Sequence, residues 1–223
     1  HITADNFVFL LRNDIDINHY IVGGEDSLIR HADGRTVIEF SDEIIMINKF
    51  FEFFKFYNPD IVSGYNTNGF DIPYVIDRCK HLGIHNIKLG RGDSDLYYRK
   101  HISKGLTVYK VDGFTGRILF DVLYMLRRED ASNTFLKKYN LKRLTLEHVS
   151  HEILGIDKLD FPISRMVDYW NNTGNRELAN EFVDYCSRDS FLPLEFIRKF
   201  RMVDRFFTLS NKSGKLPQVI INS

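Results

Sequence analysis

The first third of the chain alternates short apolar runs with segments of helical periodicity. The continuous apolar run Phe7–Leu11 is typical of a buried strand. In Ile44–Phe54, apolar and aromatic residues recur three or four positions apart, which predicts a helix capped by Ser41. Ile61–Tyr65 predicts a second buried strand, and Ile72–Leu82, with a proline near its start, predicts a second helix.

The rest of the chain is predicted to hold two more strands, followed mainly by helices. Thr107–Val111 and Arg117–Leu123 have the composition of strands, and Asp112–Gly116 between them suits a hairpin connection. Apolar residues then recur at helical spacing in Leu141–Leu154, Met166–Trp170, Arg176–Arg188 and Leu192–Leu209. Strands that come mostly before helices, with one strand–helix alternation, predict an α/β or α+β fold.

The composition is that of a globular chain without an excess of either charge. Of 223 residues, 43% are hydrophobic and 27% are charged, and 30 basic residues balance 30 acidic ones. No basic field covers the whole molecule, so a nucleic-acid site would have to be local. Two cysteines offer neither a disulfide framework nor the spacing of a zinc site. No apolar run approaches the roughly 20 residues that span a bilayer, and we therefore expect a soluble protein that is not exported.

Two short stretches carry the candidate chemistry. In the first, Asn66, Phe70 and Asp71 lie where a predicted strand gives way to a helix. An aspartate in that place is also typical of a helix cap or of a first-turn partner of the helix dipole. In the second, Tyr185 and Asp189 are four residues apart and share one face of a predicted helix, a spacing that surface pairs also have.

Taken together, the two stretches indicate a metal-dependent site. A hard divalent ion binds clustered oxygen ligands, and two such ions can stabilise both the attacking and the leaving oxygen when a phosphodiester is cleaved. Carboxylates from separate elements are what such a site needs. A tyrosine one helical turn before a metal-bound aspartate can present its hydroxyl to the attacking water.

These residues resemble the proofreading exonuclease domain of family B DNA polymerases. Asn66 with Phe70 and Asp71, followed by Tyr185 with Asp189, is similar to the second and third exonuclease motifs of that family. The likeness continues through Asn58–Asn66, Gly116–Leu123, Tyr139–Leu146, Leu154–Gly155 and the tail Leu209–Ser223. It therefore covers nearly the whole chain.

The resemblance implies a fold and a division of the chain. The fold is an α/β, ribonuclease H-like exonuclease fold, in which a central mixed sheet is flanked by helices and carries a β-hairpin insertion. Residues 1–200 would form the exonuclease domain, and residues 201–223 would form a helical link toward a polymerase palm domain.

The resemblance also implies catalytic roles. Asp71 and Asp189 would be metal-ligating carboxylates for two Mg²⁺ (or Mn²⁺) ions, and Tyr185 would orient the water nucleophile. The family's first motif, an aspartate and a glutamate separated by one residue on a strand, would precede Phe7. Because two carboxylates alone hold a pair of dications poorly, we expect cleavage to require residues upstream of His1.

Other matched residues are expected to bind substrate or to support the site. Asn66 and Phe70 would hold the frayed single strand. Lys158 is similar to a family lysine near the scissile phosphate, although a lysine close to an aspartate is also ordinary on a surface. Asp121 is expected to be structural. Within this sequence, Asp14-Ile15-Asp16 has the spacing nearest to the first motif but follows the strand, and Asp5 suits the motif no better.

The favoured hypothesis is a 3′–5′ proofreading exonuclease domain. Its partners would be the single-stranded 3′ end of a DNA primer and the polymerase domain of a longer parent chain, with no membrane involved. It would act inside the cell, in the nucleus or the cytoplasm. The alternative is a catalytically silent nucleic-acid-binding or scaffold domain of the same fold.

Overall fold

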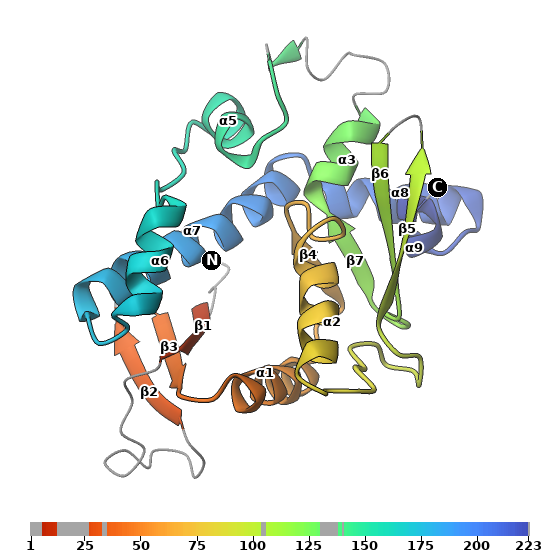
Figure 1. Cartoon of the computed structure of the whole chain (residues 1–223). Coiled ribbons are helices and arrows are strands. Elements are labelled where there is room, and N and C mark those ends of the chain that lie inside the picture. The colour runs from red at the N-terminus through yellow and green to blue at the C-terminus, as the bar shows by residue number, and fades with distance from the viewer. Residues whose placement is uncertain are drawn as a thin grey trace. The chain divides into compact units, whose positions relative to one another are not determined.

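The chain divides into two compact units, whose elements are labelled in Figure 1. The first unit comprises His1–Phe56 and Leu159–Asp189, and the second comprises Tyr57–Lys158 and Ser190–Ser223. The computed structural model describes residues 6–12, 27–32, 35–103, 106–129, 138–139 and 141–222. Asp5 and the Asp14–Asp16 segment, considered above for the first motif, lie outside these residues.

The first unit combines a small mixed sheet with helices. In the sheet, β1 pairs in parallel with β3, and β2 pairs with the other edge of β3 in the antiparallel direction. The predicted strand at Phe7–Leu11 and the predicted helix at Ile44–Phe54 are confirmed, whereas β2 and β3 were not predicted. The elements are β1 (Asn6–Leu11), β2 (Ser27–Ala32), β3 (Arg35–Phe40), α1 (Glu43–Tyr57), α6 (Ile163–Asn171) and the first part of α7 (Arg176–Lys199).

A buried ion pair explains why the hydrophobic pattern does not reveal β3. Glu39 is only 1% exposed, and its carboxylate accepts a hydrogen bond from the guanidinium of Arg12 at 2.6 Å. A buried carboxylate is tolerated when a cation compensates it, and this cation lies 27 residues away in the sequence. The charge at a core position is therefore understandable only from the tertiary structure.

Helix α1 is capped by Asp42 and not by Ser41. The Oδ1 atom of Asp42 accepts the backbone N–H of Ile45 at 2.9 Å. Serine and aspartate both make this kind of bond, so two such residues in succession leave the start of the helix ambiguous by one position.

Aromatic side chains form much of the core beneath β1. Phe9 stacks on Phe40 with ring centroids 5.7 Å apart, and it meets Phe50 and Phe53 of α1 edge to face at 5.6 and 5.2 Å. Such pairs contribute beyond the apolar area that they bury. These contacts join β1, β3 and α1, with Phe40 1% exposed and Phe50 37% exposed.

The second unit contains a parallel strand pair, a β-hairpin and several helices. β4 and β7 are parallel, and β5 and β6 form the antiparallel hairpin. The predicted strand at Ile61–Tyr65 and the predicted helix at Ile72–Leu82 are confirmed. The elements are β4 (Ile61–Gly64), α2 (Asp71–His81), β5 (Tyr97–Ser103), β6 (Leu106–Asp112), β7 (Ile118–Asp121), α3 (Val122–Glu129), α5 (Leu146–Val149), the π-helical turn η3 (Ser150–Leu154), the end of α7, α8 (Met202–Ser213) and α9 (Pro217–Asn222).

The predicted hairpin that joins Thr107–Val111 to Arg117–Leu123 is wrong, because β6 pairs with the preceding β5 and β7 pairs with β4. Two contacts redirect the chain between them. Gly113 has φ +106°, and a Cβ there would lie 2.5 Å from the carbonyl oxygen of Asp95, so a glycine is needed. The side chain of Arg117 then donates hydrogen bonds to the carbonyls of Leu89 and Pro59, which holds β7 beside β4.

The helix boundaries also differ from the prediction in the second half of the chain. The segment predicted as one helix from Leu141 is helical only from Leu146, as α5 and η3. α7 continues through Pro193, and the break before α8 comes at Arg201, whose φ is +48°. A proline nitrogen carries no hydrogen, so Pro193 cannot donate a hydrogen bond to the carbonyl of residue 189. Residue 189 is also the last residue of the first unit.

The C-terminal helices share the core of the second unit. Phe206 of α8 meets Phe120 of β7 edge to face at 5.4 Å, and Ile221 of α9 is 3% exposed within the same apolar cluster. The side chain of Gln218 accepts the backbone N–H of Leu119 at 2.8 Å. Residues 201–222 are mostly helical, and the division into a domain of residues 1–200 and a link of residues 201–223 stays a prediction.

The fold class predicted from the sequence, α/β with a β-hairpin, is confirmed. Its described strands belong to small sheets of two or three strands each. No helix among the described residues combines the length and apolar character that crossing a membrane requires.

The packing of α9 predicts that the tail stabilises the second unit. Ile221→Ala should lower the free energy of unfolding by about 2–4 kcal/mol, because it leaves a cavity in the core. Val219→Ala is the matched control on the same helix, since Val219 is 49% exposed and its truncation should cost less than about 0.5 kcal/mol. Urea unfolding followed by circular dichroism measures both. Equal effects of the two variants would show that α9 does not belong to the core.

Candidate functional site

The loop between β4 and α2 carries Asn66, Phe70 and Asp71. Asn66 has φ +63°, a left-handed conformation that asparagine tolerates better than most residues. Its carbonyl accepts the N–H groups of Gly69 and Phe70 at 3.0 and 2.9 Å, which closes a tight turn. A Cβ on Gly69 would lie 2.6 Å from Oδ1 of Asn66, so the absence of a side chain lets the Asn66 amide lie against the turn. The loop thus has a fixed shape.

Asp121, at the end of β7, holds this loop in place. Its Oδ1 accepts the N–H groups of Asn66 and Tyr124 at 3.1 and 3.2 Å, and its Oδ2 accepts the N–H of Asn68 at 2.9 Å. The residue is 3% exposed, and burial raises the pKa of its carboxyl group while the backbone hydrogen bonds lower it. These contacts agree with the structural role expected for Asp121.

Asp71 is the first residue of α2 and is exposed. The residue at the N-cap position is Phe70, so the explanation of Asp71 as a helix cap is wrong, while its place in the first turn is compatible with a favourable dipole contact. The pKa of Asp71 is raised, mainly because neighbouring atoms partly desolvate the carboxyl group although the residue as a whole is exposed. A backbone hydrogen bond of Asp71 lowers the pKa, and the negative charge of Asp121 raises it.

Tyr185 and Asp189 lie one turn apart on α7, in the first unit. The ring of Tyr185 packs on Phe161 and Phe182, with centroids 5.7 and 6.5 Å apart. Burial raises the pKa of the neighbouring Cys186 thiol to about 11, and the negative charge of Asp189 also raises it. Tyr185 and Asp189 are both partly buried, which argues against an ordinary exposed surface pair.

The predicted site residues are thus divided between the two units. Asn66, Phe70 and Asp71 lie together in the second unit, Tyr185 and Asp189 lie together in the first, and Lys158, which is partly exposed, ends a segment of the second. The approach of Asp71 to Asp189 and the role of Lys158 stay predictions. Among the described residues, no three His, Cys, Asp or Glu side chains gather closely enough to hold a metal ion.

A cavity of about 510 Å³ adjoins the loop within the second unit. The side-chain oxygen of Asn68 at this cavity is buried and accepts no hydrogen bond from the described residues. The polar and aromatic lining includes Tyr109 of β6 and Tyr124 and Arg127 of α3, which the sequence pattern does not single out. They come from separate elements and line one cavity only in the folded chain. The lining consists of Asn66, Asn68, Gly69, Thr107, Val108, Tyr109, Asp121, Leu123, Tyr124 and Arg127.

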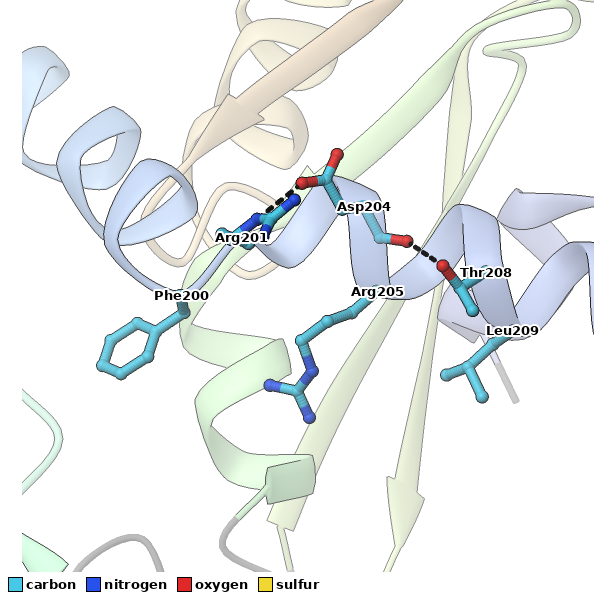
Figure 2. A pocket seen from close by; sticks show the side chains of 6 residues that line it. All are labelled: Phe200, Arg201, Asp204, Arg205, Thr208 and Leu209. Carbon is cyan, nitrogen blue, oxygen red and sulfur yellow. Dashed lines mark hydrogen bonds and ion pairs between the residues drawn. The ribbon is translucent and has the colours of Figure 1, made fainter.

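A second pocket, of about 530 Å³, lies along α8 and contains none of the predicted site residues. Figure 2 shows the ion pair of Arg201 with Asp204 and the hydrogen bond from the Thr208 hydroxyl to the Asp204 carbonyl. These contacts lie within one helix and its first turn. They engage the polar side chains of Arg201, Asp204 and Thr208 within this segment.

Comparison with known proteins decides the family. The model of the family described as DNA polymerase family B, exonuclease domain, matches residues 11–144, which include Asn66, Phe70 and Asp71. The chain belongs to the exonuclease domain of DNA polymerase family B. The family predicted from the two motifs is therefore confirmed, and the mixed α/β structure is consistent with the ribonuclease H-like fold of family B exonuclease domains.

Several curated relatives of this family B exonuclease domain are DNA polymerase delta catalytic subunits. The chain is 31% identical to the one from Candida albicans over 187 residues, 30% identical to that from Drosophila melanogaster over 190 residues, and 29% identical to that from Caenorhabditis elegans over 187 residues. In each case the match covers 81% of this chain but only 16–17% of the relative. The chain thus spans about a sixth of the length of these relatives.

The contacts of Asp121 give a testable prediction about the loop of the second motif. Asp121→Asn keeps the shape of the side chain but replaces one accepting oxygen with an NH₂ group that faces a backbone N–H. Unfolding free energy should fall by about 1–3 kcal/mol, because a buried donor loses its partner. Amide hydrogen exchange at Asn66 or Asn68 should become faster.

Asp93→Asn is the control for that experiment, since Asp93 is fully exposed and pairs with Lys88 at 3.4 Å. It should change neither stability nor exchange measurably. Unchanged exchange at both Asn66 and Asn68 in the Asp121 variant would show that the carboxylate does not hold the loop.

Proposed function

We propose that the chain is a 3′–5′ proofreading exonuclease domain of a family B DNA-directed DNA polymerase, which hydrolyses 3′-terminal nucleotides of DNA. The observation that carries this proposal is the rigid loop that sets Phe70 and Asp71 side by side at the start of α2. Two further observations support it. Tyr185 and Asp189 lie one turn apart on α7, and this chain belongs to the family whose exonuclease motifs these residues resemble.

Asp71 and Asp189 would hold the divalent ions. Carboxylate oxygens are the ligands that Mg²⁺ and Mn²⁺ prefer. The pKa of Asp71 is raised by desolvation of its own carboxyl group and by the negative charge of Asp121. A nearby cation would offset both effects, because it stabilises the ionised carboxylate. Bound ions would activate a water and stabilise the leaving oxygen of the phosphodiester. Two more carboxylates, from an aspartate–glutamate strand upstream of His1, would complete the ligand set.

The remaining predicted residues would position the reactants. The Tyr185 hydroxyl would hold the attacking water, and the packing of the Tyr185 ring on Phe161 and Phe182 restricts where that hydroxyl can lie. Asn66 and Phe70 would hold the unpaired 3′ nucleotide. Lys158 would contact the scissile phosphate, as a cation does at many phosphate sites.

The substrate would be the single-stranded 3′ end of a DNA primer, and the partner in the parent chain would be a polymerase domain. The length of the curated relatives supports a longer parent, since this chain spans about a sixth of each. A replication enzyme of this kind acts where DNA is copied, and we place the protein inside the cell, in the nucleus or the cytoplasm.

The test is Mg²⁺-dependent release of mononucleotides from a primer with a mismatched 3′ end. The polypeptide extended upstream through the aspartate–glutamate strand should cleave, whereas the 223-residue chain alone should cleave negligibly. In the extended polypeptide, Asp189→Ala should reduce cleavage to the detection limit because it removes a metal ligand. Tyr185→Phe should slow cleavage by about 10²-fold without changing the Mg²⁺ dependence.

Asp184→Asn is the matched control, because Asp184 lies on the same helix next to Tyr185 and pairs with Arg35. This variant should cleave at the unmodified rate. Full cleavage after Asp189→Ala would contradict the proposed metal site. Absence of cleavage in the folded, extended polypeptide would favour the catalytically silent binding domain.

A further inference from the structure

Two aromatic rings stand exposed on one face of α2, beside the proposed site. Phe70 is 65% exposed and Tyr74 is 60% exposed. Large aromatic side chains usually bury most of their surface, and a pair of neighbouring exposed rings is therefore typical of a binding surface. Tyr74 is not among the predicted site residues.

The geometry of the two rings suits a stacked nucleic-acid strand. Their planes are only 10° from parallel, and their centroids are 6.3 Å apart. Residues four apart lie on the same helical face, and the N–H of Tyr74 bonds to the carbonyl of Phe70 at 2.9 Å, so the helix fixes this spacing.

The charges along this face also suit DNA. Arg78 follows Tyr74 one turn further along α2 and adds a positive charge to this part of the helix. Asp77 precedes Arg78 in the sequence. Its carboxylate accepts a hydrogen bond from the hydroxyl of Tyr98 at 2.6 Å and pairs with Lys80 at 3.5 Å. Aromatic rings interleaved with cations are the usual means by which proteins hold single strands.

We propose that Tyr74 is a DNA-binding residue that extends the surface of Phe70, so that the two rings form a stacking platform for bases of single-stranded DNA upstream of the nucleotide to be removed. This inference rests on the proposed function and assigns a longer strand-binding surface to it. Phe70 takes a base next to the scissile bond at Asp71, Tyr74 takes a base farther from the 3′ end, and Arg78 contacts the backbone between or beyond them.

The first test measures binding of the 223-residue chain to a fluorescent single-stranded oligonucleotide of about 12 nucleotides at low salt. Tyr74→Ala should weaken binding by about fivefold or more, because stacking on one base is lost. Tyr74→Phe keeps the ring and should bind within a factor of about two of the unmodified chain. Circular dichroism and thermal unfolding check that each variant is folded.

Salt dependence separates the ring from the cation. Tyr74→Ala should leave the slope of log affinity against log salt unchanged, whereas Arg78→Gln should reduce that slope by about 0.7, the value for one phosphate contact on a single strand. A reduced slope for Tyr74→Ala, or undiminished affinity after the ring is removed, would overturn the platform.

An abasic scan tests contact with a base directly. One abasic residue is placed at each position from the 3′ end, and the effect of Tyr74→Ala is measured at every position. The loss of affinity caused by Tyr74→Ala should vanish when the abasic residue takes the place of the base that stacks on Tyr74. This position should lie upstream of the one at which the loss caused by Phe70→Ala vanishes. A loss that is equal at all positions would mean that Tyr74 acts only through the stability of α2.

The outcome for Tyr74 is separable from that of the proposed function. Normal binding and normal cleavage by Tyr74→Ala, with cleavage still lost in Asp189→Ala, would refute the platform and leave the exonuclease intact. If the folded chain binds no single-stranded DNA at any salt concentration, the platform is refuted as well. Position-specific binding by the 223-residue chain, together with absence of cleavage by the folded polypeptide that is extended upstream, would keep the platform and contradict the nuclease.

Discussion

The buried carboxylate of Asp121 is the contact on which the candidate site of the second unit depends. It accepts backbone N–H groups from Asn66, Asn68 and Tyr124, and thereby joins the loop after β4 to the end of β7 and the start of α3. Burial of this acid is unfavourable in isolation, and the three hydrogen bonds offset that cost. Because the loop is fixed, α2 begins at a defined place, and Phe70 and Asp71 emerge from it in a fixed order.

Helix α7 carries two further predicted site residues, which are held by a different kind of contact. Tyr185 is positioned by aromatic packing on Phe161 and Phe182, and Asp189 follows one helical turn later. The predicted residues of the second unit thus lie on a loop held by hydrogen bonds, whereas those of the first lie on a helix whose Tyr185 is held by aromatic contacts.

Much of the fold follows from local patterns, and the departures have identifiable causes. Local patterns predict β1 and β4, which are short continuous apolar runs, and α1 and α2, whose apolar residues recur at helical spacing. It fails for β3, where the buried Glu39 depends on Arg12, and for the connection after β6, where Gly113 and Arg117 turn the chain toward β4. These contacts join residues far apart in the sequence, so no local window contains them.

The candidate site shows the same division. The spacing of Asn66, Phe70 and Asp71 is visible in the sequence, as is the spacing of Tyr185 and Asp189. The number of hydrogen bonds that Asp121 accepts and the exposure of Tyr74 are not, because both depend on how β7 and α2 pack.

The central claim is that Asp71 and Asp189 are ligands of one metal site. The most direct measurement is anomalous X-ray scattering from crystals of the upstream-extended polypeptide with Mn²⁺ and a short single-stranded oligonucleotide. The account predicts Mn²⁺ bound to an oxygen of each carboxylate, with the two carboxyl groups less than about 10 Å apart, the span of a two-metal site. Mn²⁺ bound elsewhere, or carboxyl groups farther apart than this in the DNA complex, would contradict it.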